Sequence, residues 1–270
     1  MRLWELNIVC SVLIVLLSAC RGKEVYPSVR VMGHGGNGLA NPATFYHDNS
    51  LESVQCALSK PGCDGIEVDV QLSKSGTLWL FHDAVTNDEL NLNGCIGTLS
   101  DAELQTAHYK TVHQEKVLRL MDLPKELLNN KTVYLDLRHV NGCDHLLADY
   151  TKIEVQLMEF CAQFSNTNVV VFCQHIPWLK ALKQQNITVM TEIQHRTQYE
   201  AIILDFPALD GIVTRNKNIT KEEVSLIQSE QRQVVLFDMR SASGSRKALK
   251  KVPNAVLTDD LTATLIERNL

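Results

Sequence analysis

Nine short apolar runs recur along the chain, and stretches with the spacing of amphipathic helices separate most of them. Most runs are nearly continuous in Val, Ile and Leu, a pattern typical of parallel strands covered on both faces by crossover helices. The predicted strands are Val29–Met32, Gly65–Val70, Thr77–Phe81, Thr132–Leu137, Asn168–Cys173, Ile187–Ile193, Gly211–Thr214, Gln233–Phe237 and Ala255–Thr258. Repeated βα units predict a parallel sheet with right-handed crossovers.

Two α/β architectures fit this pattern, a closed TIM (β/α)8 barrel and an open doubly wound sheet. We expect the barrel, as one domain over residues 29–270, because barrels often run to about 250 residues as a single domain. A ring of eight strands leaves one predicted strand over, so one is expected to be peripheral. Residues 84–121 are the least regular and predict a small insertion beside the early strands.

The stretches between the strands carry helix signals. Asn49-Ser50 precedes a helical pattern over residues 51–58 and is suited to cap it. S-x-x-E-type capping boxes begin at Ser100 and Thr220, and one apolar stripe repeats from Leu147 to Phe164. Further helices are predicted over 180–184, 198–204 and 260–268.

The start of the chain has a different character. Ile8–Leu17 is a run of apolar residues, too short to cross a membrane comfortably, and fits the apolar region of a secretory signal. Leu17-Ser18-Ala19-Cys20 resembles a bacterial lipobox. That resemblance implies a signal peptide over residues 1–19, a lipidated Cys20 and a tether over 20–28. An uncleaved anchor or an ordinary signal is the alternative, and in each case we expect an exported domain, membrane-anchored if Cys20 is lipidated.

Charge and cysteine content narrow the functional classes. The net charge is −5 and no block of Lys or Arg stands out, which argues against a nucleic-acid partner. Six cysteines follow Cys20, and an even number in an oxidising compartment permits disulfides. Cys56 and Cys63 are close enough in sequence to pair, and buried free thiols are an equal alternative. We find no cysteine or histidine spacing of the zinc-binding type.

Acidic residues within the second predicted strand point to a metal. Glu67 and Asp69 are two residues apart, so both side chains lie on the same face of the strand. Two carboxylates on a buried face repel one another unless a positive group neutralises them. Mg²⁺ and Ca²⁺ prefer such oxygen ligands, and Asp136 on another predicted strand offers a third. A pair neutralised by Lys or Arg is the alternative.

Three further polar groups follow strands. His34 and His82 are candidates for a base and an acid, because imidazole titrates near neutral pH. Arg138 is suited to bind a phosphate oxygen, and a salt bridge to Glu67 or Asp69 is the alternative. The glycines around His34 allow a ligand to approach the backbone closely. They do not form a dinucleotide-binding fingerprint.

The order of these motifs resembles the glycerophosphodiester phosphodiesterase family. The residues that carry the resemblance are Gly33–Gly36, Asp48–Ser53, Asp64–Gly76 and His82–Asp83, with thinner agreement at Leu135–Arg138, Asp210–Val213 and Leu257–Asp260. The resemblance implies a TIM barrel that hydrolyses a glycerophosphodiester to glycerol 3-phosphate and an alcohol, with Mg²⁺ or Ca²⁺. It implies Glu67, Asp69 and Asp136 as metal ligands and His34 and His82 as acid and base. The implied nucleophile is the glycerol's own hydroxyl, which forms a cyclic phosphate.

The chain departs from the family pattern in three places. Gly35 stands where the family has a phosphate-binding Arg, and His47-Asp48-Asn49-Ser50 stands for Pro-Glu-Asn-Thr. Asp136 and Arg138 replace the usual Glu and Lys. Loss of an Arg at position 35 removes a bidentate phosphate contact, which Arg138 is suited to replace in part. The substrate-binding positions predicted are therefore Gly35 and Arg138.

Two other functions are compatible with the sequence. The same metal and histidines serve a phospholipase D-like or cyclising lyase reaction on a lysophospholipid. The second alternative is a surface lipoprotein that binds a phosphodiester or glycan without turnover. It is suggested by Gly35, which stands where the family has a phosphate-binding Arg. The retained acid and base candidates, His34 and His82, argue against it, because a binding protein needs neither.

Overall fold

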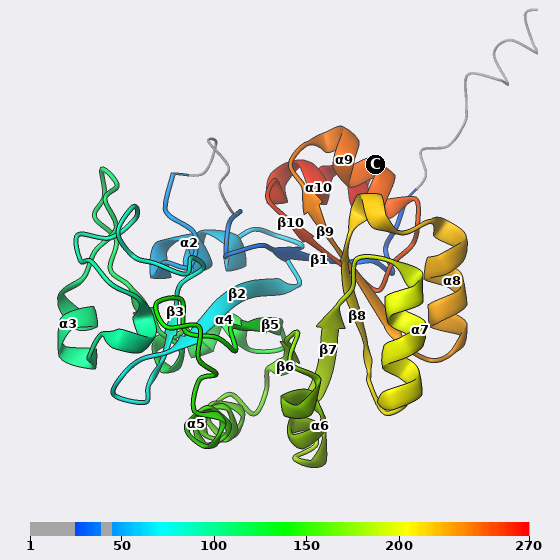
Figure 1. Ribbon diagram of the computed structural model, residues 1–270. Helices are drawn as coiled ribbons and strands as arrows, with labels where there is room; N and C mark the ends of the chain where they lie inside the picture. Colours follow the sequence, from blue (N-terminus) through cyan, green and yellow to red (C-terminus); the bar gives the residue numbers. More distant parts are fainter. Residues whose placement is uncertain (1–24, 39–44, 270) are drawn as a thin grey trace, which may run out of the picture.

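The computed structural model describes residues 25–38 and 45–269, and within these ranges eight parallel strands form a ring. The ring strands are β1 (Arg30–Gly33), β2 (Gly65–Leu72), β5 (Thr132–Leu137), β6 (Asn168–Phe172), β7 (Thr188–Glu192), β8 (Gly211–Arg215), β9 (Gln233–Met239) and β10 (Ala255–Thr258). β1 pairs in parallel with both β10 and β2, which closes the ring (Figure 1). The predicted TIM barrel is confirmed, and the open sheet is excluded.

The predicted strand over 77–81 is the peripheral one. It forms β3 (Leu78–Leu80), which pairs antiparallel with β2, and β4 (Leu118–Arg119) pairs antiparallel with β3 outside the ring. The chain therefore folds back on β2, and the backbone N–H of Phe81 donates to the carbonyl of Asp69 at 3.1 Å. His82 therefore follows the peripheral strand, and the sequence did not identify which of the nine this is. An antiparallel hairpin returns His82 to the same rim.

Helices cover the outside of the ring. They are α2 (Leu51–Leu58), α4 (Lys125–Leu128), α5 (Tyr150–Gln163), α6 (Ile176–Gln184), α7 (Arg196–Asp205), α8 (Lys221–Ser229), α9 (Ala242–Leu249) and α10 (Leu261–Asn269). Ser50 caps α2 through the backbone N–H of Ser53 at 3.1 Å, as predicted. The sequence did not reveal α4 or α9. α9 contains Ser and Gly, which are poor helix formers, and buries Ala248 and Leu249 against its neighbours.

Strand alternation separates two cores and thereby positions the site. Val68 and Leu135 face the helices and join the large outer core. Tyr134 and Met32 belong to a smaller core inside the ring. Because successive side chains of a strand alternate between faces, Asp136 shares the inner face with Tyr134. Apolar residues therefore fill the barrel interior while carboxylates crowd one rim.

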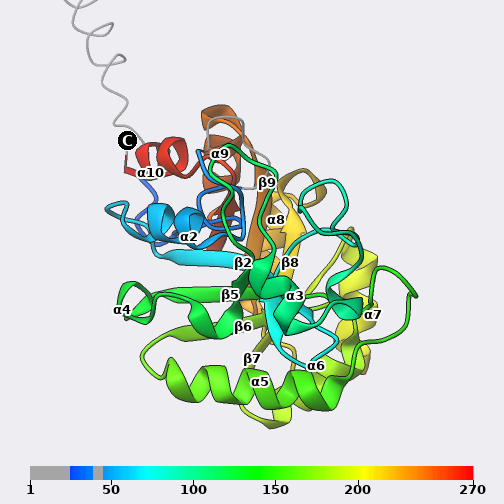
Figure 2. The ribbon, with the colours of Figure 1, turned by 90° about the vertical axis from the view of Figure 1, so that its left-hand side faces the viewer.

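The segment between β2 and β5 forms a small subdomain on one side of the barrel (Figures 1 and 2). It contains η1 (Ile96–Thr98), α3 (Asp101–Thr106) and η2 (Leu120–Asp122), which agrees with the predicted insertion. A separate apolar core that includes Trp79, Leu90 and Tyr109 supports it. α3 begins with the predicted capping box.

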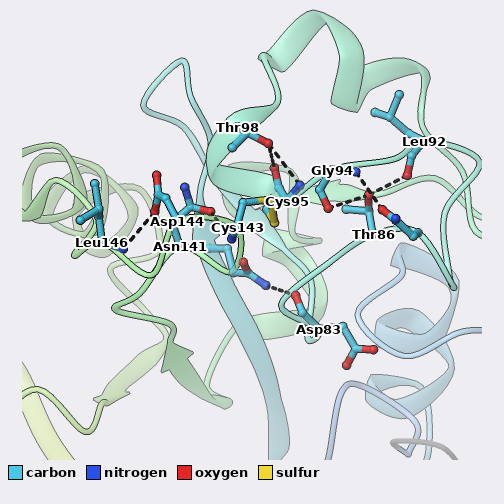
Figure 3. Close-up of a disulfide and its surroundings, with 12 residues drawn as sticks. Asp83, Thr86, Leu92, Gly94, Cys95, Thr98, Asn141, Cys143, Asp144 and Leu146 are labelled. Carbon is cyan, nitrogen blue, oxygen red and sulfur yellow. Dashed lines mark hydrogen bonds between the residues drawn. A yellow bond between two sulfur atoms is a disulfide. The ribbon is translucent and has the colours of Figure 1, made fainter.

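A disulfide between Cys95 and Cys143 fastens this subdomain to the loop after β5 (Figure 3). Cys56 and Cys63 are both free, so of the two alternatives the unpaired one holds. The predicted signal peptide and lipidated Cys20 lie outside the described residues. Among the described residues, we find no helix long and apolar enough to cross a membrane.

Candidate active site

Three carboxylates predicted as metal ligands meet at the rim of the barrel. Glu67 and Asp69 lie on the inner face of β2 and are almost fully buried. Asp136 of β5 is directly opposite Asp69 in the strand register. One oxygen of each of the three carboxylates lies within 4.8 Å of the others. The structure therefore assembles the predicted oxygen cluster.

The electrostatics of this cluster favour a cation. Burial, reinforced by the charge of Asp69, raises the pKa of Glu67 above its ordinary value. Burial also raises the pKa of Asp136 to about 7, although Arg138 opposes the shift. The carboxyl groups of Glu67 and Asp136 thus hold their protons more readily than usual. A bound hard cation would remove the repulsion between the charged carboxylates. Three oxygen donors of this kind fit Mg²⁺ or Ca²⁺.

Arg138 is placed between two of the carboxylates. Its Nη2 donates to Asp69 Oδ1 and lies 3.1 Å from Asp136 Oδ2. The salt bridge given as the alternative role of Arg138 is therefore present, to Asp69. Burial alone would raise the pKa of Asp69, but Arg138 outweighs it and the pKa is lowered. The guanidinium neutralises part of the cluster, and its side chain remains 34% exposed at the cleft.

The glycine-rich turn after β1 holds Glu67. The backbone N–H of Gly35 donates to Glu67 Oε2 at 3.0 Å. Gly35 has a φ of +59°, and a Cβ there would lie 2.8 Å from the Cβ of Asp48. A side chain at position 35 would thus need both a left-handed backbone and a displaced neighbour. A role for Gly35 toward substrate stays a prediction.

His34 is part of a carboxylate–imidazole pair. Its Nδ1 lies 2.7 Å from Asp259 Oδ1, and its Nε2 lies 3.6 Å from Glu67 Oε2. Burial would lower the pKa of His34, but the Glu67 charge and the Asp259 hydrogen bond outweigh burial and raise it to about 9. Asp259 was not predicted as a site residue. Its available signals were its position directly after the last strand and the thin family agreement at Leu257–Asp260.

His82 has a similar partner but a more open position. Its Nδ1 lies 2.6 Å from Asp83 Oδ1, and its side chain is 36% exposed. His82, His34, Asp69 and Asp136 all line one cavity of about 160 Å³. The two histidines and the carboxylate cluster are thus brought together as predicted.

Asn49 is a further site residue that the sequence did not reveal. Its Nδ2 donates to Asp69 Oδ2 at 2.9 Å, and its Oδ1 accepts from the backbone N–H of Asp69 at 3.0 Å. The sequence suggested a helix cap at Asn49-Ser50 and placed Asn49 within a family motif, but neither observation gave it a role toward Asp69. Its role toward Asp69 follows from tertiary packing between the α2 entry and β2.

The cleft has two connected parts. The cavity of about 160 Å³ extends over β8, β9 and β10, where Arg215, Asp238 and Arg240 line it. A second cavity of about 240 Å³ extends over β6 and the loop after β5, where Gln174 and His139 line it. Both cavities share His82, Asp136, Arg138, Phe172 and Glu192. Asp136 of the carboxylate cluster therefore lies where the two parts join.

The chain also matches a known protein family over most of its length. The sequence pattern of the glycerophosphoryl diester phosphodiesterase family matches residues 34–267. The chain belongs to this family. That membership confirms the resemblance found in the motifs and identifies the chain as a glycerophosphodiester phosphodiesterase-type enzyme. The matched range includes every predicted metal, acid and base residue from His34 to Asp136, and also Gly35 and Arg138.

Two curated relatives are distant in sequence. A glycerophosphodiester phosphodiesterase of Bacillus altitudinis is 22% identical over 228 residues, which cover 79% of this chain and 89% of the relative. Glycerophosphodiester phosphodiesterase 1 of Homo sapiens is 25% identical over 187 residues, which cover 66% of this chain and 53% of the human protein.

Solved structures share the fold. A phosphodiesterase of Oleispira antarctica, in complex with the product sn-glycerol-3-phosphate, has a TM-score of 0.72 at 18% identity and covers 88% of this chain and 96% of its own. A glycerophosphodiester phosphodiesterase of Agrobacterium tumefaciens has a TM-score of 0.70 at 15% identity, covering 89% of this chain and 99% of its own. At these identities the similarity establishes the barrel fold alone. The roles of the site residues follow from the contacts that they make in this chain.

Proposed function

We propose that this protein hydrolyses glycerophosphodiesters to glycerol 3-phosphate and an alcohol in a metal-dependent reaction, with His34 and His82 as acid and base. The observation that carries the proposal is the placement of two carboxylate-supported imidazoles beside a buried oxygen cluster in one cleft. The complex of the Oleispira antarctica enzyme with sn-glycerol-3-phosphate supports the product class.

Glu67, Asp69 and Asp136 would hold the cation. Bound Mg²⁺ or Ca²⁺ supplies positive charge for the phosphoryl oxygens and increases the acidity of the attacking hydroxyl. Gly35 and Asn49 keep two of the ligands in place, through Glu67 Oε2 and Asp69 Oδ2 respectively. Arg138, 34% exposed, is available to contact a phosphoryl oxygen once the cation neutralises the carboxylates.

The two histidines carry the protons. One imidazole accepts the proton of the attacking glycerol hydroxyl, and the other donates a proton to the oxygen of the departing alcohol. The P–O bond to that alcohol breaks as the bond to the glycerol hydroxyl forms, which yields a cyclic phosphate. In the second step the roles reverse, and water opens the ring. Asp259 and Asp83 contact Nδ1 of His34 and His82, which leaves Nε2 of each imidazole as the atom that exchanges the proton.

The reaction is tested by product analysis on protein stripped with EDTA. We expect Mg²⁺, Ca²⁺ or Mn²⁺ to restore glycerol 3-phosphate release from glycerophosphocholine or glycerophosphoethanolamine, measured with a coupled dehydrogenase. Glu67→Gln should abolish metal-restored turnover, whereas Glu200→Gln, a surface carboxylate paired with Arg196, should not. His82→Ala should slow turnover by about 10² or more.

Silence with both substrates and all three metals would contradict the proposal. Phosphorus NMR of lysophospholipid reactions would then test the cyclising or phospholipase D-like alternative, for which the diagnostic products are a cyclic phosphate or a free headgroup. Binding without turnover would leave the non-catalytic alternative.

We also propose that the protein is exported and anchored through a lipid on Cys20. The support is the sequence Leu17-Ser18-Ala19-Cys20 after an apolar run. Mass spectrometry of the expressed protein should find a lipidated N-terminal Cys20, and Cys20→Ser should release it from membranes. An intact Met1 on the mature protein would contradict this proposal.

A further inference from the structure

The end of β9 is irregular where it enters the cleft. Leu236 pairs with Val256 of β10, but the next pair joins Met239 to Thr258, so the strand contains a bulge at this point. Asp238 within it has a φ of 74°, in the left-handed region that is uncommon for residues with a Cβ. Bulges and strained backbone concentrate where a strand must aim a side chain at a functional site.

The bulge aims Asp238 at two arginines. Asp238 Oδ2 accepts from Arg215 Nη1 at 3.0 Å, and Asp238 Oδ1 lies 3.3 Å from Arg240 Nε. Arg240 Nε also lies 3.4 Å from Asp259 Oδ2. The Arg215 guanidinium is 5.1 Å from the centre of the Phe237 ring, within the range of a cation–π contact. Asp238 thus holds the two guanidinium groups side by side.

With respect to residues 25–38 and 45–269, most donors of these arginines remain available to a ligand. A guanidinium has five N–H donors, and the contacts above engage Nη1 of Arg215 and Nε of Arg240. Their side chains are 40% and 67% exposed and line the same cavity as His34. Arg138, in contrast, is engaged with two carboxylates.

The arginines stand across the barrel from the carboxylate cluster. In the ring order, β8 lies opposite β2, and β9 lies opposite β5. A diester whose phosphate is bound by a cation at Glu67, Asp69 and Asp136 has room in the shared cavity to extend one ester arm toward Arg215 and Arg240.

We propose that Arg215 and Arg240 form an anion subsite that binds a second negative group, a carboxylate or phosphate, on the alcohol arm of the substrate. This inference rests on the proposed function and adds a substrate class to it. Charge-assisted hydrogen bonds from two guanidinium groups match the geometry of such an anion. The carboxylates of Asp238 and Asp259 are engaged in positioning the arginines and His34, which directs the remaining donors into the cleft.

The test compares two diesters that differ by one carboxylate, glycerophosphoserine and glycerophosphoethanolamine, with the full chain and Mg²⁺. We expect kcat/KM to favour the serine diester by about tenfold, the scale of one hydrogen bond to a charged group. Arg215→Gln and Arg240→Gln should each remove most of that preference. Arg196→Gln, which removes an arginine 49% exposed on α7 outside this cleft, should retain it. Binding of both diesters to the His82→Ala protein, by calorimetry, provides a readout without turnover.

The outcomes separate the two proposals. The subsite is overturned if both diesters are turned over without a preference for the serine diester. It is also overturned if both variants keep that preference. Either result would leave the proposed function standing. Equal losses on both diesters would also overturn the subsite, because the arginines would then act on a group that both substrates share. If neither of these diesters nor glycerophosphocholine is turned over with Mg²⁺, Ca²⁺ or Mn²⁺, the proposed function fails. Calorimetry then tests the subsite. The His82→Ala protein should bind the serine diester more tightly than the ethanolamine diester, and the Arg215→Gln, His82→Ala protein should not.

Discussion

Asn49 and Asp69 are joined by two hydrogen bonds that run in opposite directions. The amide of Asn49 donates to the carboxylate of Asp69 at 2.9 Å and accepts from its backbone N–H at 3.0 Å. One side chain thereby fixes both the strand and the ligand that the strand presents. Partners of this kind orient metal ligands and tune their affinity.

Asn49→Ala is expected to weaken Mg²⁺ binding by about tenfold to a hundredfold, because Asp69 loses its orienting partner. It should also lower the free energy of unfolding by about 2–4 kcal/mol, because a buried N–H loses its acceptor and Ala disfavours the φ of 58°. Calorimetric Mg²⁺ titration and urea unfolding measure the two effects. Asn130→Ala is the matched control, since Asn130 has a φ of 60° on the surface. Equal Mg²⁺ affinities in the two variants would refute the role of Asn49.

Arg138→Met is expected to change metal affinity and turnover in opposite directions. The guanidinium lies beside Asp69 and Asp136 and repels a cation held by the same carboxylates. Its removal should tighten Mg²⁺ binding by about tenfold, measured above the pH at which Glu67 and Asp136 lose their protons, and slow turnover because a phosphoryl contact is lost. Arg138→Lys retains a positive charge, so its Mg²⁺ affinity and its turnover should lie between those of wild type and those of the Met variant. Weaker Mg²⁺ binding by the Met variant would show that Arg138 supports the cation site.

The parts of the site that the sequence predicts are those governed by strand periodicity. Glu67 and Asp69 share a face because they are two residues apart, and Asp136 joins them because β5 is the parallel neighbour of β2. Near-continuous apolar runs likewise predict the barrel, since parallel strands are buried on both faces.

The parts that it does not predict depend on contacts between distant segments. Asn49 and Asp259 reach the site from an irregular loop and from the last strand, and no local pattern announces their partners. The sequence does not predict the antiparallel pairing of β3 with β2, because the apolar run of β3 has the same pattern as a strand of the ring. The pairing of Cys95 with Cys143 follows from where the insertion packs, and sequence spacing suggested a different pair.

The disulfide is expected to stabilise the subdomain that borders the cleft. It closes a loop across a sequence separation of 48 residues, for which chain entropy predicts about 4 kcal/mol. Cys95→Ser, Cys143→Ser should therefore lower the free energy of unfolding by about 2–4 kcal/mol in urea. It should also raise KM, because His139 and Val140 on the tethered loop line the larger cavity. Cys56→Ser, at a free and half-buried cysteine, is the control. A double variant as stable as this control would contradict the prediction.

The pH dependence of stability is expected to contain a contribution from His47. Its Nδ1 lies 2.8 Å from Asp48 Oδ1, and its ring stacks on Tyr109 with 3.8 Å between centroids. Burial would lower the pKa of His47, but the hydrogen bond and charge of Asp48 outweigh burial and raise it to about 9. Because the folded pKa exceeds the unfolded value of about 6.5, this stabilisation is complete below pH 6.5 and is lost as the pH rises through 9.

His47→Gln should therefore destabilise the protein most at pH 6 and least at pH 10, with the difference between the two pH values reaching at most roughly 3 kcal/mol. His34 titrates in the same range, so the contribution is read from the difference between wild type and variant in urea unfolding at each pH. The exposed His113 supplies the control His113→Gln, with which the His47→Gln difference is compared at each pH. A His47→Gln difference that does not shrink between pH 6 and pH 10 would show that Asp48 does not stabilise the protonated ring. The stacking on Tyr109 would then account for the stability that His47 contributes.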